Sequence, residues 1–328
     1  MVQLLLVGIG AGVTSALLFA TLATGQAFAI GLFYLTPLPI LLAGIAWNHI
    51  AGAIAALTAA VLLGAFLGLW FVLAFLIGIG LPAYILAYLA LLARPANNGS
   101  HDTLDWYPVG RLVLAGALIA ATATALSVPA FGTDAEGYRS ALKEAFERVL
   151  RAQTDTAAGQ ALTLPGVQDV PRFLDFLTIV MPPAAAVLSM ITSLFNLWLA
   201  GRVARLSGRL ARPWPDLGEM RFPPTAPLLL AAAVAGTFLP GIIAIVAGFF
   251  AATLLIAYAA LGFSIIHGAS RAFPARVLML SAVWFSVFLI GWPVLLVALI
   301  GLADSFIDFR ARFGGGGTNL PTHRPPNE

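Results

Sequence analysis

Two groups of polar side chains in otherwise apolar sequence could contact a ligand. Ser189, Thr192 and Asn196 occur at i, i+3 and i+7, so a helix would place two hydroxyls and one amide on a single face. The second group occupies three consecutive positions at the end of an apolar segment: Trp47, Asn48 and His49. Both groups offer hydrogen bonding and stacking, and we treat them as candidate ligand-binding residues. The alternatives are helix–helix hydrogen bonds for the first group and an anchor at the membrane surface for the second.

The sequence lacks catalytic signatures. It contains no G-x-S-x-G, H-E-x-x-H or G-x-x-x-x-G-K-[ST] motif, and it contains no cysteine. These absences remove the usual machinery of hydrolases, metalloproteases and nucleotide-cleaving enzymes, together with thiolate metal sites. We therefore expect no enzymatic activity, no cofactor and no metal site. A membrane enzyme that uses Asp304 or His267 is the remaining alternative, but we prefer an ion pair at a helix end, formed by Asp304 and Asp308 with Arg312.

Small residues recur at every fourth position near the N-terminus: Gly8, Gly12, Ala16, Ala20 and Thr24. On a helix this spacing forms one stripe, and such a stripe lets two helix backbones approach closely in lipid. The stripe could pack inside the protein's own bundle, or it could dock on another membrane protein. We keep its first four members as candidate partner-docking residues.

The helices that position these residues must lie in a membrane. The 328-residue chain is 60% apolar and 9% charged, whereas a soluble protein carries about 25% charged residues. The first 93 residues contain no Asp, Glu, Lys or Arg. No aqueous surface can be built from such a segment, so the composition excludes a soluble enzyme domain. It predicts an all-α, polytopic transmembrane helical bundle.

Ten apolar segments are candidate spans: residues 1–24, 27–47, 50–68, 69–92, 111–128, 173–200, 225–239, 241–266, 277–290 and 293–307. A helix needs about 20 apolar residues to cross a hydrocarbon core of about 30 Å, so the short last four leave eight, nine or ten crossings open. Pro37 and Pro39 predict a kink or break in the second segment, and Gly78, Gly80 and Pro82 predict one in the fourth. We expect residues 1–312 to form a single transmembrane domain and residues 313–328 to form a disordered cytoplasmic tail.

The charges between these segments predict the orientation of the chain. Residues 129–172 carry five basic and six acidic residues and an amphipathic helical pattern, so we expect a surface helix outside the cell membrane. Five arginines lie within residues 202–221, which places that loop in the cytoplasm by the positive-inside rule. Both termini are then cytoplasmic. We expect a multi-pass protein of a bacterial inner membrane that has the lipid bilayer, and no nucleic acid, as its partner.

Three stretches are similar to a known family: Leu35–Gly52, which contains Pro37 and Pro39; Gly262–Ile266; and Gly301–Arg310, which contains Asp304, Asp308 and Arg310. They resemble the YybS-like family of bacterial multi-pass membrane proteins over roughly residues 1–312. That family is distantly similar to the substrate-binding S-components of energy-coupling-factor transporters, which capture vitamins or metal ions and dock on a coupling subunit through the first helix. The resemblance implies an S-component-like N-terminal part with extra C-terminal helices. It also implies a docking role for the small-residue stripe and a pocket role for the broken early helices.

Two functions fit these observations. The leading hypothesis is a small-molecule-binding or transport-associated membrane subunit without its own ATPase, which would dock on a partner through the first helix. The alternative is a membrane scaffold for envelope-synthesis or cell-division proteins. A polar pocket near Trp47 and Asn196 would favour the first function, and a filled core would favour the second.

Overall fold

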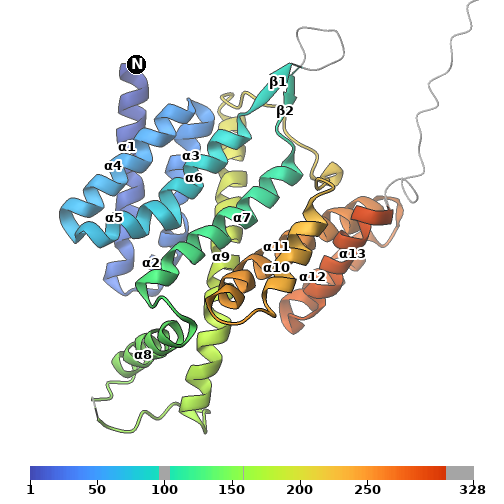
Figure 1. Ribbon diagram of the computed structural model, residues 1–328. Helices are drawn as coiled ribbons and strands as arrows, with labels where there is room; N and C mark the ends of the chain where they lie inside the picture. The colour runs from blue at the N-terminus through green and yellow to red at the C-terminus, as the bar shows by residue number, and fades with distance from the viewer. Residues whose placement is uncertain (96–103, 158, 308–328) are drawn as a thin grey trace, which may run out of the picture. The chain divides into compact units, whose positions relative to one another are not determined.

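The structure is a computed structural model that describes residues 1–95, 104–157 and 159–307, and these are almost entirely helical (Figure 1). Within them, seven helical segments are long and apolar enough to cross a membrane: Val2–Thr24, Phe28–Ala46, His49–Leu67, Leu69–Ala90, Val109–Ala130, Val170–Leu206 and Ile242–Ala269. Three shorter helices are also apolar: Ala226–Gly236, Arg276–Ile290 and Pro293–Ile307. Each apolar segment expected from the sequence is thus helical, and the prediction of a polytopic helical bundle is confirmed.

The chain divides into two compact units, Met1–Ala257 and Tyr258–Glu328, and the second is described as far as Ile307. The helices that lie wholly in unit 1 are α1 (Val2–Ala20), α2 (Ala27–Tyr34), α3 (Pro37–Ala46), α4 (His49–Leu67), α5 (Leu69–Phe75), α6 (Leu81–Ala90), α7 (Val109–Ser127), α8 (Ala135–Gln153), α9 (Val170–Leu206) and α10 (Ala226–Gly236). Helix α11 (Ile242–Ala269) begins in unit 1 and ends in unit 2, which also contains α12 (Arg276–Ile290) and α13 (Pro293–Ile307).

Helix α1 lies beside α4 and packs against it through the stripe of small residues (Figure 1). Gly8, Gly12 and Ala16 are buried. A methyl group at Gly8 would lie 2.7 Å from Cβ of Ile54, and one at Gly12 would lie 2.6 Å from the carbonyl oxygen of Ala55. The two backbones are therefore closer than any larger residue at these positions would permit. Close packing inside the bundle uses this face of α1.

The predicted break at Pro37 is confirmed, because α2 ends at Tyr34 and α3 begins at Pro37. Proline has no N–H group, so the regular pattern of i to i−4 hydrogen bonds cannot continue through this point. The N–H of Leu38 instead bonds to the carbonyl of Leu35 at 2.9 Å, in a tighter turn. The carbonyl of Tyr34 loses its helical donor as a result.

The predicted interruption of the fourth segment is also confirmed, as a widened turn. Between α5 and α6 the chain forms a π-helical turn over Leu76–Gly80, directly before Pro82. Pro82 cannot donate a hydrogen bond to the carbonyl of Gly78, and a π turn is one way to accommodate a lost bond within a continuous helix.

A short hairpin follows α6 and is an element that the sequence analysis missed. Strands β1 (Ala93–Pro95) and β2 (Leu104–Trp106) pair in antiparallel register, with Arg94 opposite Asp105. The side chains of these two residues form an exposed ion pair at 3.6 Å. Strands of three residues are too short to show an alternating pattern of apolar and polar positions, which is the usual sequence signal for a strand.

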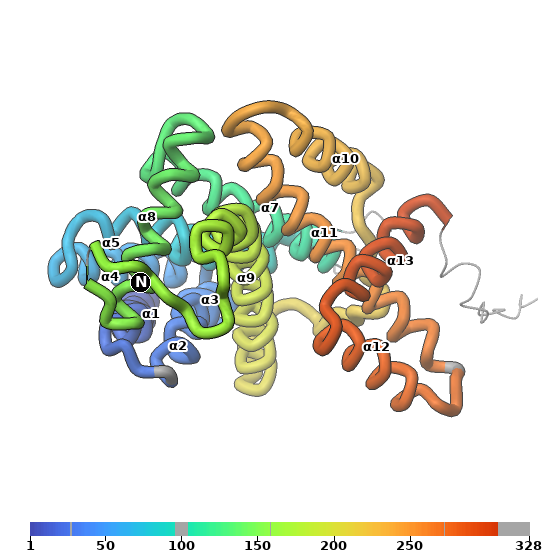
Figure 2. Tube along the Cα trace, turned by 90° about the horizontal axis from the view of Figure 1, so that it is seen from below, coloured from blue at the N-terminus to red at the C-terminus, as the bar shows by residue number. Residues whose placement is uncertain are grey.

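Helix α8 confirms the predicted amphipathic surface helix. Asp134 caps its start by accepting hydrogen bonds from two backbone N–H groups of the first turn. Tyr138 and Leu142 are buried among apolar residues of α7, α9 and the first part of α11. Lys143 also forms an ion pair with Asp175 of α9, beside which α8 lies in Figure 2. The helix therefore covers one end of the bundle in unit 1.

Unit 2 is held together by a second close approach of two backbones. A methyl group at Gly262 of α11 would overlap the carbonyl oxygen of Val297, and one at Gly301 of α13 would overlap the carbonyl oxygen of Tyr258. The two glycines thus allow α11 and α13 to cross in direct backbone contact, as small residues do in lipid.

Candidate functional site

Asn196, the last residue of the first predicted polar group, is fully buried and binds the broken second span. Its Nδ2 atom donates hydrogen bonds of 2.8 Å to the carbonyl of Tyr34 and to the carbonyl of Thr192. Tyr34 is the residue whose carbonyl loses its helical donor at the proline break. An amide from α9 thus supplies the missing bond, which a lipid environment requires.

Ser15 of α1 also binds the chain at this break. Its hydroxyl donates a hydrogen bond of 2.8 Å to the carbonyl of Thr36, and both residues have no exposed surface. Ser15, Thr36 and Asn196 therefore form a buried polar cluster between α1, α3 and α9. Ser189 and Thr192 are half-buried on the same helix as Asn196.

The second predicted group lies at the other end of α3. Asn48 caps α4 by accepting a hydrogen bond of 3.0 Å from the N–H of Ile50. The ring of His49 packs edge-on against Tyr88 of α6, with 5.5 Å between centroids. The guanidinium of Arg209 lies 4.6 Å above the ring of Trp47, in a cation–π contact.

The structure does not bring these two predicted groups together. Asn196 meets the chain at Tyr34, directly before α3, whereas Trp47 directly follows this helix of ten residues. Ten helical residues span about 15 Å, so the two groups lie at separate levels of the bundle. Their assignment as ligand-binding residues stays a prediction, and their visible contacts are a buried hydrogen bond, a helix cap and ring contacts.

The arginine-rich segment after α9 folds onto this end of unit 1. The guanidinium carbons of Arg202 and Arg205 lie 5.7 and 5.4 Å from the centroid of the Trp214 ring, in cation–π contacts. Arg212 donates hydrogen bonds of 3.1 Å to the carbonyl of Ala90, at the end of α6, and of 3.3 Å to the carbonyl of Tyr107, after β2. Burial lowers the pKa of the Arg212 guanidinium below its ordinary value. These arginines thus link separate segments of unit 1.

The partner-docking residues of α1 face the bundle interior. Gly8, Gly12 and Ala16 are covered by α4, and Ala20 is half-buried at the end of the helix. A separate protein that used this stripe would have to displace α4. Docking through it remains a prediction, and the structure supplies ordinary packing as a sufficient reason for the spacing.

The remaining predicted residues are spread over the chain. Pro37 and Pro39 both lie at the start of α3, where they cause the break. Asp304 is half-buried on α13. Asp308 and Arg310, like the predicted tail, lie outside the residues that the structure describes.

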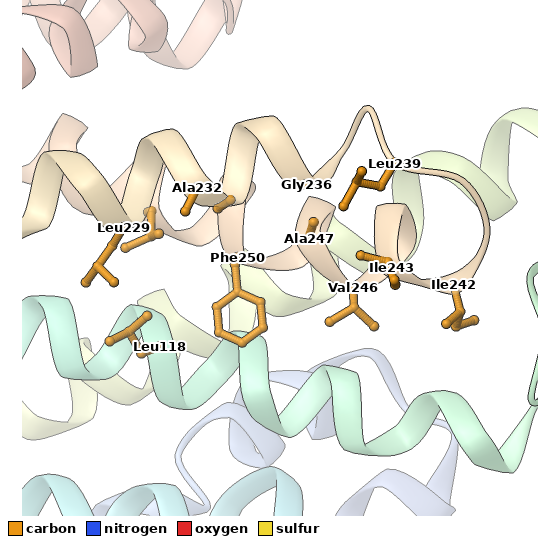
Figure 3. A pocket seen from close by; sticks show the side chains of 12 residues that line it. Leu118, Leu229, Ala232, Gly236, Leu239, Ile242, Ile243, Val246, Ala247 and Phe250 are labelled. Carbon is orange, nitrogen blue, oxygen red and sulfur yellow. The ribbon is translucent and has the colours of Figure 1, made fainter.

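An apolar cavity of about 580 Å³ lies between α7, α10 and α11, all within unit 1. Figure 3 shows Leu118 of α7 and Leu229 at one end, Phe250 in the middle, and Leu239 and Ile242 at the other end. All twelve lining residues are apolar. The volume is in the range of small-molecule sites, about 300 to 1,000 Å³.

Sequence reasoning did not find this cavity. Small residues on facing helices are the signal that could have indicated it: Ala232, Ala233 and Gly236 on α10, and Ala247 on α11. Gly236 and Ala247 touch, because a methyl group at Gly236 would lie 2.8 Å from Cβ of Ala247. Periodicity shows that such residues share a face, but it does not show how far the opposite helix stands from them.

Comparison with known proteins places the chain in a family. No curated protein and no solved structure matches it. A family model matches residues 12–305, which extend from α1 into α13 and so include nearly all of the described bundle. The chain belongs to this family, which is described as a predicted membrane protein family (DUF2232).

Proposed function

We propose that this protein is a small-molecule-binding or transport-associated subunit of the bacterial inner membrane, and that its ligand is apolar. The observation that carries the proposal is the cavity between α7, α10 and α11, whose lining offers no polar side chain. Such a lining favours a hydrocarbon-like molecule over a vitamin or nucleoside, because a polar ligand would lose its hydrogen bonds to water without replacement.

The polar cluster supports the choice of this cavity over the site expected near Asn196. Asn196, Ser15 and Thr36 have no exposed surface. Two hydrogen bonds from this cluster reach carbonyls at the proline break. A ligand at this place would have to displace packed side chains and leave backbone carbonyls unpaired in lipid.

The finer parts of the proposal come from the sequence. The sequence carries no G-x-x-x-x-G-K-[ST] motif, so any energy for transport would come from a partner. The S-components of energy-coupling-factor transporters, to which the YybS-like family is distantly similar, work in this way. The arginines of residues 202–221 favour a cytoplasmic loop there, and both termini are then cytoplasmic. We propose no enzymatic activity, no cofactor and no bound metal.

Analysis of the compounds that copurify with the protein tests this function. The protein would be extracted in mild detergent, and its bound small molecules would be released by solvent and identified by mass spectrometry. Ala233 lines the cavity, and Ala231, two residues earlier on α10, is exposed and outside the lining. We expect a compound in near-stoichiometric amount with the wild type and with Ala231→Trp, but not with Ala233→Trp. Equal retention by both variants, or no retained compound, would contradict the proposal.

A scaffold for envelope-synthesis or cell-division proteins is the second candidate. It is supported by the filled core around Asn196 and by the exposed aromatic face of α12 in unit 2, where Phe285 and Phe288 are 66% and 94% exposed. Apolar surface is ordinary on a helix that faces lipid, so this face alone does not favour a protein partner. Copurification separates the candidates: a nucleotide-binding ATPase with a coupling subunit supports the first function, and envelope machinery supports the second.

A further inference from the structure

We infer that the cavity between α7, α10 and α11 holds one acyl chain of an anionic membrane phospholipid, with the headgroup beside Arg111. The inference rests on the proposed function and names the class of its ligand. Three properties of the site carry it: the length of the cavity, its place among apolar helices that could lie in a membrane, and the charge at one of its ends.

The length of the cavity matches one leaflet of a bilayer. Its lining runs from Leu229 to Leu239 along the α10 side and from Ile242 to Leu254 along α11. The helical parts of these intervals, residues 229–236 of α10 and 242–254 of α11, correspond to about 10 and 18 Å. Half of a hydrocarbon core of about 30 Å is about 15 Å, which is the depth reached by one acyl chain.

The cavity lies in the part of the chain that faces hydrocarbon. Helices α7 and α11 belong to candidate membrane spans, and α10 is one of the shorter apolar helices. An apolar cavity that opens to the hydrocarbon core of a membrane is filled by lipid chains, because lipid chains are the solvent of that core. Specific binding of one lipid requires a further interaction, and the charged end of the cavity provides it.

One end of the cavity is formed by Leu118 and Leu229, and Arg111 lies beyond this end. It precedes Leu118 by seven residues on α7, which is two helical turns, so both side chains lie on one face with Arg111 about 10 Å closer to the helix start. Arg111 is exposed. A headgroup phosphate of a lipid whose chain fills the cavity would therefore meet a guanidinium at this level.

The backbone of a second arginine, Arg221, contacts the same end of α7. A methyl group at Gly110 would overlap the carbonyl oxygen of Arg221, so the segment that leads into α10 touches the start of α7. The start of α7 also carries the positive end of the helix dipole. Basic pockets between membrane helices on the cytoplasmic side favour anionic headgroups, and the positive-inside rule places this end in the cytoplasm.

Native mass spectrometry of the full chain tests the inference. The protein would be delipidated in detergent and supplied with equal amounts of phosphatidylglycerol and phosphatidylethanolamine that carry identical acyl chains. We expect one bound lipid per chain and a preference for phosphatidylglycerol. Arg111→Gln should reduce that preference by roughly fivefold, the effect of one basic residue near an anionic surface. Arg139→Gln, an exposed position on α8, is the control and should leave it unchanged.

The variants separate this inference from the proposed function. Ala233→Trp should reduce binding of both lipids by about tenfold, because the indole fills the cavity. If Ala233→Trp abolishes binding but the two lipids bind equally and Arg111→Gln has no effect, the cavity binds apolar ligands and the headgroup inference is wrong. If Ala233→Trp changes nothing, both the inference and the proposed function fail.

A measurement on the wild-type chain covers the case in which a variant does not fold. Phosphatidylglycerol with a photoreactive diazirine in the middle of one chain would be crosslinked to the protein and its adducts mapped. We expect adducts concentrated within residues 229–254. Adducts spread over other exposed positions, such as Leu69 and Trp70, would show an ordinary annulus of lipid and overturn the inference.

Discussion

Asn196 Nδ2 donates a hydrogen bond of 2.8 Å to the carbonyl oxygen of Tyr34, a residue 162 positions earlier in the chain. This bond joins α9 to the second span at the place where Pro37 prevents regular helical bonding. The bond therefore links a long-range contact to a local defect in the backbone. In water, solvent could satisfy the Tyr34 carbonyl, but in hydrocarbon a protein donor is needed.

Replacement of Asn196 by leucine should destabilise the protein. The variant keeps a similar volume but leaves the Tyr34 carbonyl without a donor. Hydrogen bonds between membrane helices contribute about 0.6 to 2 kcal/mol, and we expect a loss in that range. Thermal unfolding in detergent measures it. Ser189→Ala, a half-buried position on the same face of α9, is the control and should stay near the wild type. Equal unfolding temperatures for all three proteins would show that the hydrogen bond from Asn196 to Tyr34 does not contribute to stability.

Substitutions at Gly12 and Gly10 test the packing of α1. A methyl group at Gly12 would lie 2.6 Å from the carbonyl of Ala55, whereas nothing lies within 4 Å of one at Gly10. We expect Gly12→Ala to cost about 1 to 3 kcal/mol, as overpacking does. Gly10→Ala should be neutral or stabilising by up to about 1 kcal/mol, because alanine favours a helix. Unfolding in detergent compares the two. A fully stable Gly12→Ala protein would mean that α1 and α4 are not in contact there, and would reopen partner docking.

The sequence predicts the apolar segments, the proline break and the surface helix well, because each depends on local chemistry. Pro37 has no N–H in any fold, and the charges and spacing of α8 define its buried face wherever the helix lies. The contacts of Gly12 are different. The spacing of small residues shows that they share a face, but the identity of the opposing helix depends on the whole bundle.

For the candidate site, too, the sequence predicts local features but not long-range contacts. The sequence correctly places Ser189, Thr192 and Asn196 on one helix, but it contains no signal that Asn196 would bind the carbonyl of a distant residue. The cavity between α7, α10 and α11 was missed because its lining residues are those of any membrane helix. Only the separation of three helices makes them a site, and separation is a tertiary property.

Removal of Arg212 should release the segment after α9 from unit 1. Its guanidinium bonds two carbonyls at once, those of Ala90 and Tyr107, and hydrogen bonds from charged groups contribute about 1.5 to 3 kcal/mol. We expect Arg212→Ala to speed trypsin cleavage after Arg209. Arg212→Lys should be intermediate, because an ammonium group lacks the planar fork. Arg94→Ala removes an exposed ion pair and is the control. Unchanged cleavage in Arg212→Ala would show that the segment is held by other contacts.

Unit 2 offers a matched pair of glycines. A methyl group at Gly301 would overlap the carbonyl of Tyr258, and one at Gly268 has nothing within 4 Å. Gly301→Ala should therefore force α13 away from α11 and lower the free energy of unfolding by about 1 to 3 kcal/mol, whereas Gly268→Ala should not. Hydrogen exchange of α13 measures the effect locally. Unchanged or slower exchange in Gly301→Ala would mean that the close approach of α11 and α13 does not limit the stability of this unit.

The absence of cysteine from the sequence permits a direct test of orientation. Ser140 on α8 and Ser207 after α9 are both exposed, and each can be replaced by cysteine with little change of volume. The positive-inside rule puts the arginines that follow Ser207 in the cytoplasm. A maleimide that cannot cross the membrane should therefore label Ser140→Cys in intact spheroplasts, and Ser207→Cys only after the membrane is opened. The reverse pattern would invert the topology and would place Arg111, and with it the proposed headgroup site, in the outer leaflet.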